Sequence, residues 1–129
     1  MFLLSVNRRL PAFLLFSKVY ALAALSDHAD PATFHIVRYH QAWMEDDRLY
    51  IQTELCSSNL FGEIEHSGGR LSEERRYKLL REMLLALEFI HREGMCHLDI
   101  KPENIFVKTN VFKLGRTSRR AFTDDSRIF

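Results

Sequence analysis

The strongest constraint on the fold is a helical pattern that runs from residue 72 to residue 93. Apolar side chains recur there every three or four residues, which places them on one face of an α-helix. Ser72 is a suitable N-cap and Gly94 a suitable stop. At 1.5 Å per residue the helix is about 33 Å long. Because one face of it is apolar, we predict that it packs in the core. The predicted apolar face consists of Tyr77, Leu80, Leu84, Leu87 and His91, with Leu79, Met83, Ala86 and Ile90 beside them.

Shorter segments on both sides of this helix have strand character. Residues 36–44 and 48–53 flank an acidic turn and predict an antiparallel hairpin with Leu49 and Ile51 on one face. After the helix, strand-like pieces occupy residues 95–97, 105–107 and 111–114. Two shorter helices are expected over residues 18–25 and 60–64. The predicted fold class is therefore α+β.

Length, charge and cysteine content restrict the class of protein further. A chain of 129 residues suits one domain. Residues 26–110 carry fifteen acidic and ten basic side chains, and this acidic body argues against nucleic acid as a partner. Cys56 and Cys96 have neither zinc-site nor disulfide-framework spacing, so reduced thiols in an intracellular protein are expected. The six histidines show no metal-ligand spacing.

The first 16 residues are apolar and basic, and they contain no acid. This is the composition of a targeting signal. The apolar run at residues 10–16 is short, however, because a helix needs about 20 residues to span a bilayer. We expect an atypical segment over residues 1–17 that joins the following helix and no membrane partner; a cleaved signal or an anchor is the alternative.

The stretch HLDIKPEN, residues 97–104, places four polar functional groups in one loop between the long helix and a small hairpin. Phosphoryl transfer uses such a set: a carboxylate orients the attacking hydroxyl, a cation steadies the phosphoryl group, and an amide oxygen binds Mg²⁺. The spacing from His97 through Asp99 to Asn104 matches the protein-kinase catalytic loop, with Leu98 in place of the usual arginine. A polar turn that only caps the helix is the alternative.

The chain resembles a eukaryotic protein kinase, in particular the Wee/Myt group, which phosphorylates cyclin-dependent kinases. The resemblance rests on HIVRYHQAWMEDDRLYIQTELC (35–56), LLALEFIH (84–91) and HLDIKPENIF (97–106). It implies a partial protein-kinase-like fold: the end of the small lobe, the hinge, and the first part of the mainly helical large lobe. It also implies ATP and Mg²⁺ as cofactors, a cyclin-dependent kinase as substrate or partner, and a nuclear or cytoplasmic location.

By the same resemblance, each candidate site residue has a role. Asp99 would be the catalytic base, Lys101 the phosphate-side cation and Asn104 a Mg²⁺ ligand. Thr53 would be the gatekeeper of the nucleotide pocket. The hinge, whose backbone meets adenine, would be formed by Glu54, Leu55 and Cys56.

Several kinase motifs are absent from the sequence. There is no glycine-rich phosphate loop and no strand lysine before residue 18, Lys18 stands where the family has a glutamate, and FKLG is followed by Arg116 instead of Asp-Phe-Gly or Asp-Leu-Gly. We therefore expect a partial kinase domain over residues 18–115, a disordered basic tail over residues 116–129, and weak binding of ATP and Mg²⁺. A kinase fragment, a non-catalytic pseudokinase-like interaction module and a form anchored through residues 1–16 are the alternatives for the chain as it stands.

Overall fold

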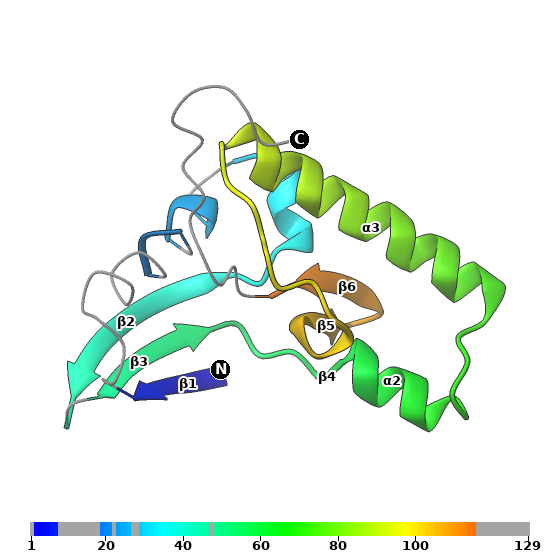
Figure 1. The fold of residues 1–129 in the computed structure, drawn as a ribbon, viewed down its shortest axis with the longest axis horizontal. Coiled ribbons are helices and arrows are strands. Elements are labelled where there is room, and N and C mark those ends of the chain that lie inside the picture. Colours follow the sequence, from blue (N-terminus) through cyan, green and yellow to red (C-terminus); the bar gives the residue numbers. More distant parts are fainter. Residues whose placement is uncertain (1, 8–18, 22, 27–28, 47, 116–129) are drawn as a thin grey trace.

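The computed structural model describes residues 2–7, 19–21, 23–26, 29–46 and 48–115. They form two three-stranded sheets, with the long helix α3 (Glu73–Arg92) beside the second sheet (Figure 1). Lys18, the tail 116–129 and most of the segment 1–17 lie outside the described residues. Within the described part of the chain, no helix is both long and apolar enough to cross a bilayer.

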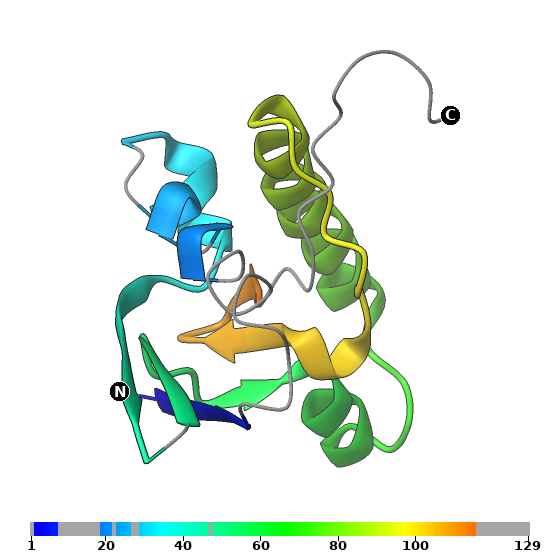
Figure 2. The ribbon, with the colours of Figure 1, turned by 60° about the vertical axis from the view of Figure 1, so that its left-hand side comes forward.

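The first sheet has the order β1–β3–β2 and is antiparallel throughout, with β1 spanning Phe2–Asn7, β2 Tyr39–Glu45 and β3 Arg48–Thr53. The hairpin of β2 and β3 confirms the prediction, and Leu49, Ile51 and Thr53 alternate into the interior. The third strand, β1, was not predicted, because its apolar residues resemble a targeting signal and nothing local specifies that they pair with β3 (Figure 2). Residues 36–38 form only an isolated bridge from Ile36 to Leu114.

The second sheet has the order β4–β5–β6, with β4 spanning Ser58–Asn59, β5 Ile105–Lys108 and β6 Val111–Leu114. Strands β5 and β6 confirm the predicted hairpin, whose turn uses positive φ angles at Thr109 and Asn110. The two-residue strand β4 lies in a polar stretch where no strand was expected. The predicted strand at residues 95–97 is wrong, because this segment makes no ladder and leads into the catalytic-loop motif as irregular backbone.

Helix α3 begins and ends where its capping residues predict. The side chain of Ser72 accepts a hydrogen bond from the N–H of Arg75 at 3.2 Å. At the other end, Gly94 has φ +70°, and the N–H groups of Gly94 and Met95 bond the carbonyls of His91 and Ile90, both at 3.0 Å. This pair of bonds is the Schellman motif, which a glycine favours because it adopts positive φ without strain. The same motif turns the chain toward residue 97.

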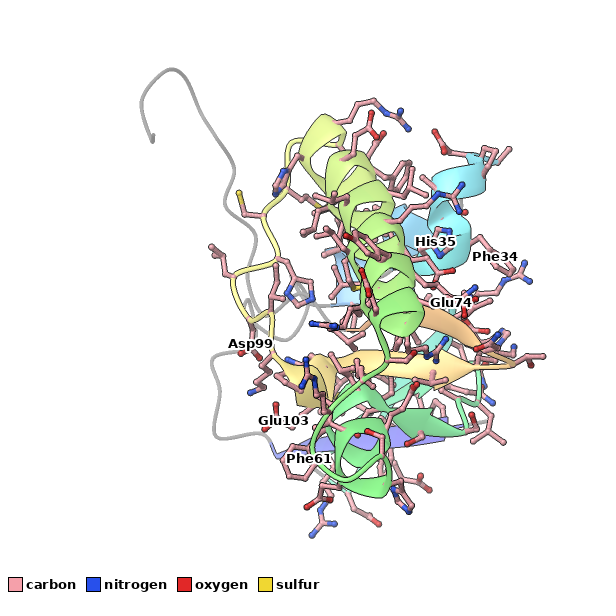
Figure 3. All side chains as sticks on the ribbon, turned by 90° about the vertical axis from the view of Figure 1, so that its right-hand side faces the viewer. Phe34, His35, Phe61, Glu74, Asp99 and Glu103 are labelled. Carbon is pink, nitrogen blue, oxygen red and sulfur yellow. The ribbon has the colours of Figure 1, made fainter. Side chains whose placement is uncertain are left out.

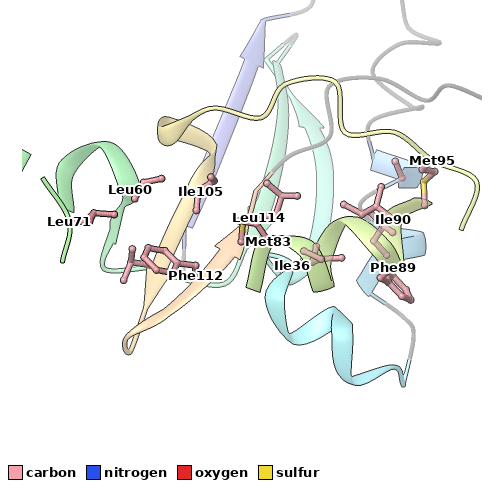
Figure 4. Close-up of a cluster of buried hydrophobic side chains, with 14 residues drawn as sticks. Ile36, Leu60, Leu71, Met83, Phe89, Ile90, Met95, Ile105, Phe112 and Leu114 are labelled. Carbon is pink, nitrogen blue, oxygen red and sulfur yellow. The ribbon is translucent and has the colours of Figure 1, made fainter. Parts of the chain in front are cut away.

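Only part of the predicted apolar face of α3 is buried. The helix residues that point into the core are Met83, Ala86, Phe89 and Ile90, whereas Tyr77, Leu80 and Leu84 are 67, 57 and 56% exposed. The main core lies between α3, the hairpin β5–β6, and the 3-10 helix η1 (Pro31–His35) (Figure 4). Its labelled members in that view are Ile36, Leu60, Leu71, Met83, Phe89, Ile90, Met95, Ile105, Phe112 and Leu114.

Arg75 ties the start of α3 to two other elements. Its guanidinium bonds Glu63, on helix α2 (Leu60–His66), at 2.5 and 2.9 Å. It also bonds the carbonyl and side-chain oxygens of Asn110 at 2.9 and 2.7 Å, and lies 3.9 Å from the ring centre of Phe112. Since a bidentate arginine fixes both distance and orientation, this residue locks α2, α3 and the β5–β6 turn together.

Candidate active site

The candidate site is the loop from His97 to Asn104, which runs from the end of α3 to the 3-10 helix η2 (Pro102–Asn104) and strand β5. The yellow segment in Figure 1 traces this path from the end of α3 down to β5. Because a rigid helix precedes the loop and a hydrogen-bonded hairpin follows it, both ends are fixed. Such loops on rigid elements are where functional side chains concentrate.

His97 is buried and joins two parts of the site. Its Nδ1 accepts a hydrogen bond from the N–H of Asp99 at 3.3 Å, so the ring proton lies on Nε2, which donates to the carbonyl of Gly115 at 3.1 Å. Burial lowers the pKa of His97, against the opposing effects of Gly115 and Asp99, so the ring is neutral at neutral pH. No role was predicted for His97. Its place in the loop motif was the available signal.

Leu98 adopts an unusual backbone conformation. Its φ is +60°, which non-glycine residues rarely adopt, and its side chain is exposed. The flanking residues hold this conformation, since His97 bonds the N–H of Asp99 and Asn104 bonds the Asp99 carbonyl. Strain of this kind persists only where the surroundings over-determine the backbone.

The side chains of Lys101 and Asn104 both contact the carboxylate of Asp99. The amide Nδ2 of Asn104 donates to Asp99 Oδ2 at 2.8 Å and to the Asp99 carbonyl at 2.9 Å, and Lys101 Nζ lies 3.3 Å from Asp99 Oδ1. Slight desolvation tends to raise the pKa of Asp99, but the bonds from Asn104 and Lys101 outweigh it, and the pKa lies below its ordinary value. Asp99 is therefore a carboxylate at neutral pH. Figure 3 shows its side chain at the surface of the loop.

The residues present fit part of a Mg²⁺ site. Within the described part of the chain, no donor reaches the Oδ1 of Asn104, so this amide oxygen can accept a metal. Mg²⁺ in phosphoryl-transfer sites takes one or two carboxylates together with substrate phosphates. Both oxygens of Asp99 already have partners, and no cluster of three His, Cys, Asp or Glu side chains able to hold a metal occurs among the described residues. Asn104 would thus hold one coordination position.

The predicted hinge residues follow directly after β3. Thr53 and Glu54 are buried, Cys56 is half-buried, and Leu55 is exposed. Thr53 Oγ1 lies 3.3 Å from the Glu54 carbonyl, and the Glu54 N–H is occupied by the carbonyl of Arg38 at 2.9 Å. The N–H groups of Leu55 and Cys56 have no backbone partner among the described residues. They can therefore donate hydrogen bonds to a ligand.

The hinge and the loop are connected through the second sheet. Ser57 bonds the Val107 carbonyl through its N–H at 2.8 Å and its hydroxyl at 2.9 Å. Asn59, which caps α2, also reaches the Glu103 carbonyl at 3.4 Å. Residues directly after the hinge thus bond the strand that follows the loop, so the two predicted parts of the site belong to one framework.

The side chain of Glu54 has a role that the sequence analysis missed. Its carboxylate accepts the Arg38 N–H at 2.9 Å and pairs with Lys108 at 2.6 Å and Lys113 at 3.0 Å. Burial tends to raise the pKa of Glu54, but these bonds overcome it, so the pKa lies below its ordinary value. Lys113 also bonds the Phe34 carbonyl at 2.5 Å. The sequence signal for this pairing was Lys113 itself, because it is a lysine placed between two apolar strand residues.

Comparison with known proteins identifies the family to which this loop and hinge belong. The family model described as "Protein kinase domain" matches residues 22–115. A Wee1-like protein kinase of Arabidopsis thaliana is 41% identical over 98 residues, which is 76% of this chain and 19% of that protein. Wee1-like protein kinase 2 of Ailuropoda melanoleuca and of Canis lupus familiaris are each 42% identical over 94 residues, 70% of this chain and 16% of each relative.

The chain thus spans less than a fifth of the length of these relatives. The matched segment contains the hinge, helix α3 and the whole loop from His97 to Asn104. Its last residue, Gly115, is the one whose carbonyl His97 bonds. The kinase resemblance of the motifs is confirmed, and the chain belongs to the protein kinase family.

Proposed function

We propose that this chain is the hinge and catalytic-loop portion of a Wee1-like protein kinase that transfers the γ-phosphate of ATP to a protein hydroxyl group. The observation that carries the proposal is the ionised carboxylate of Asp99, fixed by Asn104 and Lys101 on a loop anchored at both ends. A carboxylate held in this way can accept the proton of an attacking hydroxyl.

The other residues support this step. Lys101 is half-exposed, so its ammonium group can turn from Asp99 toward an incoming phosphate. Asn104 offers its Oδ1 to Mg²⁺, which bridges and neutralises phosphate oxygens when bound. The N–H groups of Leu55 and Cys56 are the described hinge donors left for adenine.

A cyclin-dependent kinase is the proposed substrate, and the nucleus or cytoplasm the proposed location. Both follow from the similarity to Wee1-like kinases, which spans the hinge, α3 and the loop.

The test is a reconstituted kinase domain. In it, residues 22–115 of this chain replace the matching segment of a Wee1-like kinase domain, which supplies the phosphate loop, the strand lysine, an Asp-Leu-Gly after Gly115 and the remaining large lobe. The domain should phosphorylate a cyclin-dependent kinase peptide. Asp99→Asn should lower its turnover by roughly 10²–10⁴-fold, the usual contribution of a positioned acid–base group, and should leave ATP affinity nearly unchanged.

The matched control is Glu103→Gln, which removes an exposed carboxylate from the same loop. It should leave turnover unchanged. If Asp99→Asn kept full turnover, or abolished ATP binding as strongly as turnover, the assignment of this loop as catalytic would be wrong.

A second candidate function is a non-catalytic interaction module. One observation favours it: the residue after Gly115 is Arg116, where a kinase that binds Mg²⁺ has an aspartate. Turnover in the reconstituted domain and a capture experiment separate the candidates. Turnover that depends on Asp99 supports the kinase portion, whereas no turnover together with capture of a cyclin-dependent kinase by the 129-residue chain supports the module.

A further inference from the structure

A cavity of about 450 Å³ lies between the helical residues 23–26, η1 and the β5–β6 hairpin. Leu25, Pro31, Phe34 and Ile36 form its apolar wall. Figure 3 shows Phe34 and Asp99 on opposite sides of α3, so this cavity is separate from the catalytic loop. Its volume falls within the range of about 300–1,000 Å³ that is usual for small-molecule sites.

The charged residues of the cavity carry an excess of positive charge. Arg38, Lys108 and Lys113 line it together with the single buried carboxylate of Glu54. The other acidic lining residue, Asp30, is paired with Arg92 and adds no net charge. The hydrogen bond and the charge of Glu54 raise the pKa of Lys108, so this lysine is cationic near neutral pH. Over the described lining residues together with Arg92, the partner of Asp30, the excess is therefore two positive charges.

The basic side chains of the cavity also have N–H donors that no described residue accepts. The Glu54 carboxylate already accepts three bonds, from the Arg38 N–H, Lys108 and Lys113. Lys108 uses one of its three N–H donors there. In the described structure the guanidinium of Arg38 makes no hydrogen bond or ion pair, although the side chain lines the cavity. Arg38 and Lys108 are thus free to bind an anion at the cavity rim.

We propose that this cavity binds a small phosphate monoester with an apolar substituent. The phosphate group contacts Arg38 and Lys108, with Lys113 beneath them, and the substituent packs on Leu25, Phe34 and Ile36. A dianion fits better than a carboxylate because it matches the excess of two charges. Phosphate monoesters carry about −1.5 to −2 at neutral pH, and an arginine fork suits their oxygens. This site does not depend on the proposed phosphoryl transfer.

Titration calorimetry of the 129-residue chain with phenyl phosphate tests the proposal. We expect saturable binding with a dissociation constant of about 1 mM or tighter, weaker binding of inorganic phosphate, and none of phenol. Affinity should rise between pH 5.5 and pH 7.5, because the second ionisation of a phosphate ester has a pKa of about 6. Arg38→Gln should weaken binding about tenfold or more, since it removes a charge-assisted contact.

Arg81→Gln is the matched control, since Arg81 is an exposed arginine on α3 outside the cavity lining. It should leave the affinity unchanged. The thermal midpoint of Arg38→Gln, measured by circular dichroism, should equal that of the parent chain, because the guanidinium has no partner among the residues that the structure describes. The proposal is overturned by equal weakening in both variants, by phenol binding as well as its phosphate, or by no saturable binding. Tighter binding of a phosphotyrosine peptide than of phenyl phosphate would overturn the small-molecule assignment.

Discussion

The side-chain amide of Asn104 holds Asp99 twice, through the carboxylate at 2.8 Å and through the carbonyl at 2.9 Å. One bond orients the carboxylate and keeps it ionised, and the other shapes the loop around Leu98. Because both bonds come from the same nitrogen, the Oδ1 of Asn104 faces the site without a partner among the described residues. The residue thus links the shape of the loop, the charge of Asp99 and an amide oxygen that can accept a metal.

Asn104→Ala in the reconstituted kinase domain should therefore change two properties. Loss of the bond to Oδ2 raises the pKa of Asp99, which is now lowered first by Asn104 and then by Lys101. The acidic limb of the pH–kcat profile should move to higher pH, because the carboxylate is protonated sooner as the pH falls. The Mg²⁺ concentration that gives half-maximal rate should also rise, since a ligand is lost.

Glu103→Gln serves as the control here as well, and its profile should overlay that of the parent domain. A shift of the acidic limb to lower pH in Asn104→Ala would contradict the hydrogen-bond assignment. An unchanged Mg²⁺ requirement would contradict the role of Asn104 as a ligand.

Local signals in the sequence were sufficient for helix α3, for the hairpin of β2 and β3 and for the loop motif. Helix α3 begins after Ser72 and ends before Gly94 because each capping residue acts on its own neighbours. Alternation in residues 48–53 was enough to place Leu49 and Ile51 inside. The spacing within one loop was likewise enough to bring Asp99 and Asn104 together, since only five positions separate them.

Contacts between distant segments were not predictable in the same way. Glu54 and Lys113 pair across 59 positions, and this pairing depends on how the hinge lies against β6. Strand β1 pairs with β3 although its sequence is also compatible with a targeting signal. The apolar face of α3 is wide, and its covered half is determined by β6 and η1, so Phe89 is buried while Tyr77 is exposed.

Glu54→Gln should destabilise the chain strongly. It removes the carboxylate that pairs with Lys113, whose side chain is 7% exposed, and leaves a buried cation without a counter-charge. Breaking a buried pair from one side costs about 3 kcal/mol or more. Urea unfolding of Glu54→Gln should show this loss at pH 7, whereas Glu88→Gln, an exposed carboxylate on α3, should stay within about 0.5 kcal/mol of the parent.

The stabilisation by Glu54 should also depend on pH. Its pKa in the folded chain lies below the ordinary value of 4.5, so the stabilisation is complete above that pH and is lost as the pH falls through the folded value. The difference in unfolding free energy between the parent and Glu54→Gln should shrink below pH 4.5. A difference that grew on acidification would contradict the pairing.

Arg75→Lys should show that the fork of Arg75, and not only its charge, holds α2 to α3. Lysine keeps the charge but cannot reach Glu63 and Asn110 together, nor stack on Phe112 as a planar group. We expect a loss of about 1–3 kcal/mol in unfolding free energy. Arg76→Lys, at the neighbouring exposed position, should cost almost nothing. Equal effects of the two substitutions would contradict the clamp.

The exposed side of α3 should make the isolated 129-residue chain poorly soluble and able to bind an apolar dye. Tyr77, Leu80 and Leu84 present apolar surface on consecutive turns, and exposed patches of this kind promote association. Replacing Leu80 and Leu84 together by lysine should raise solubility and reduce binding of an apolar dye, with little change in helix content, because neither side chain contributes to the core. Met83→Lys, on the buried side of the same turn, should unfold the chain, since Met83 is 8% exposed and packs in the core. Light scattering, dye fluorescence and circular dichroism measure these effects. Absence of dye binding by the unaltered chain, or unfolding by the double lysine variant, would contradict this account of α3.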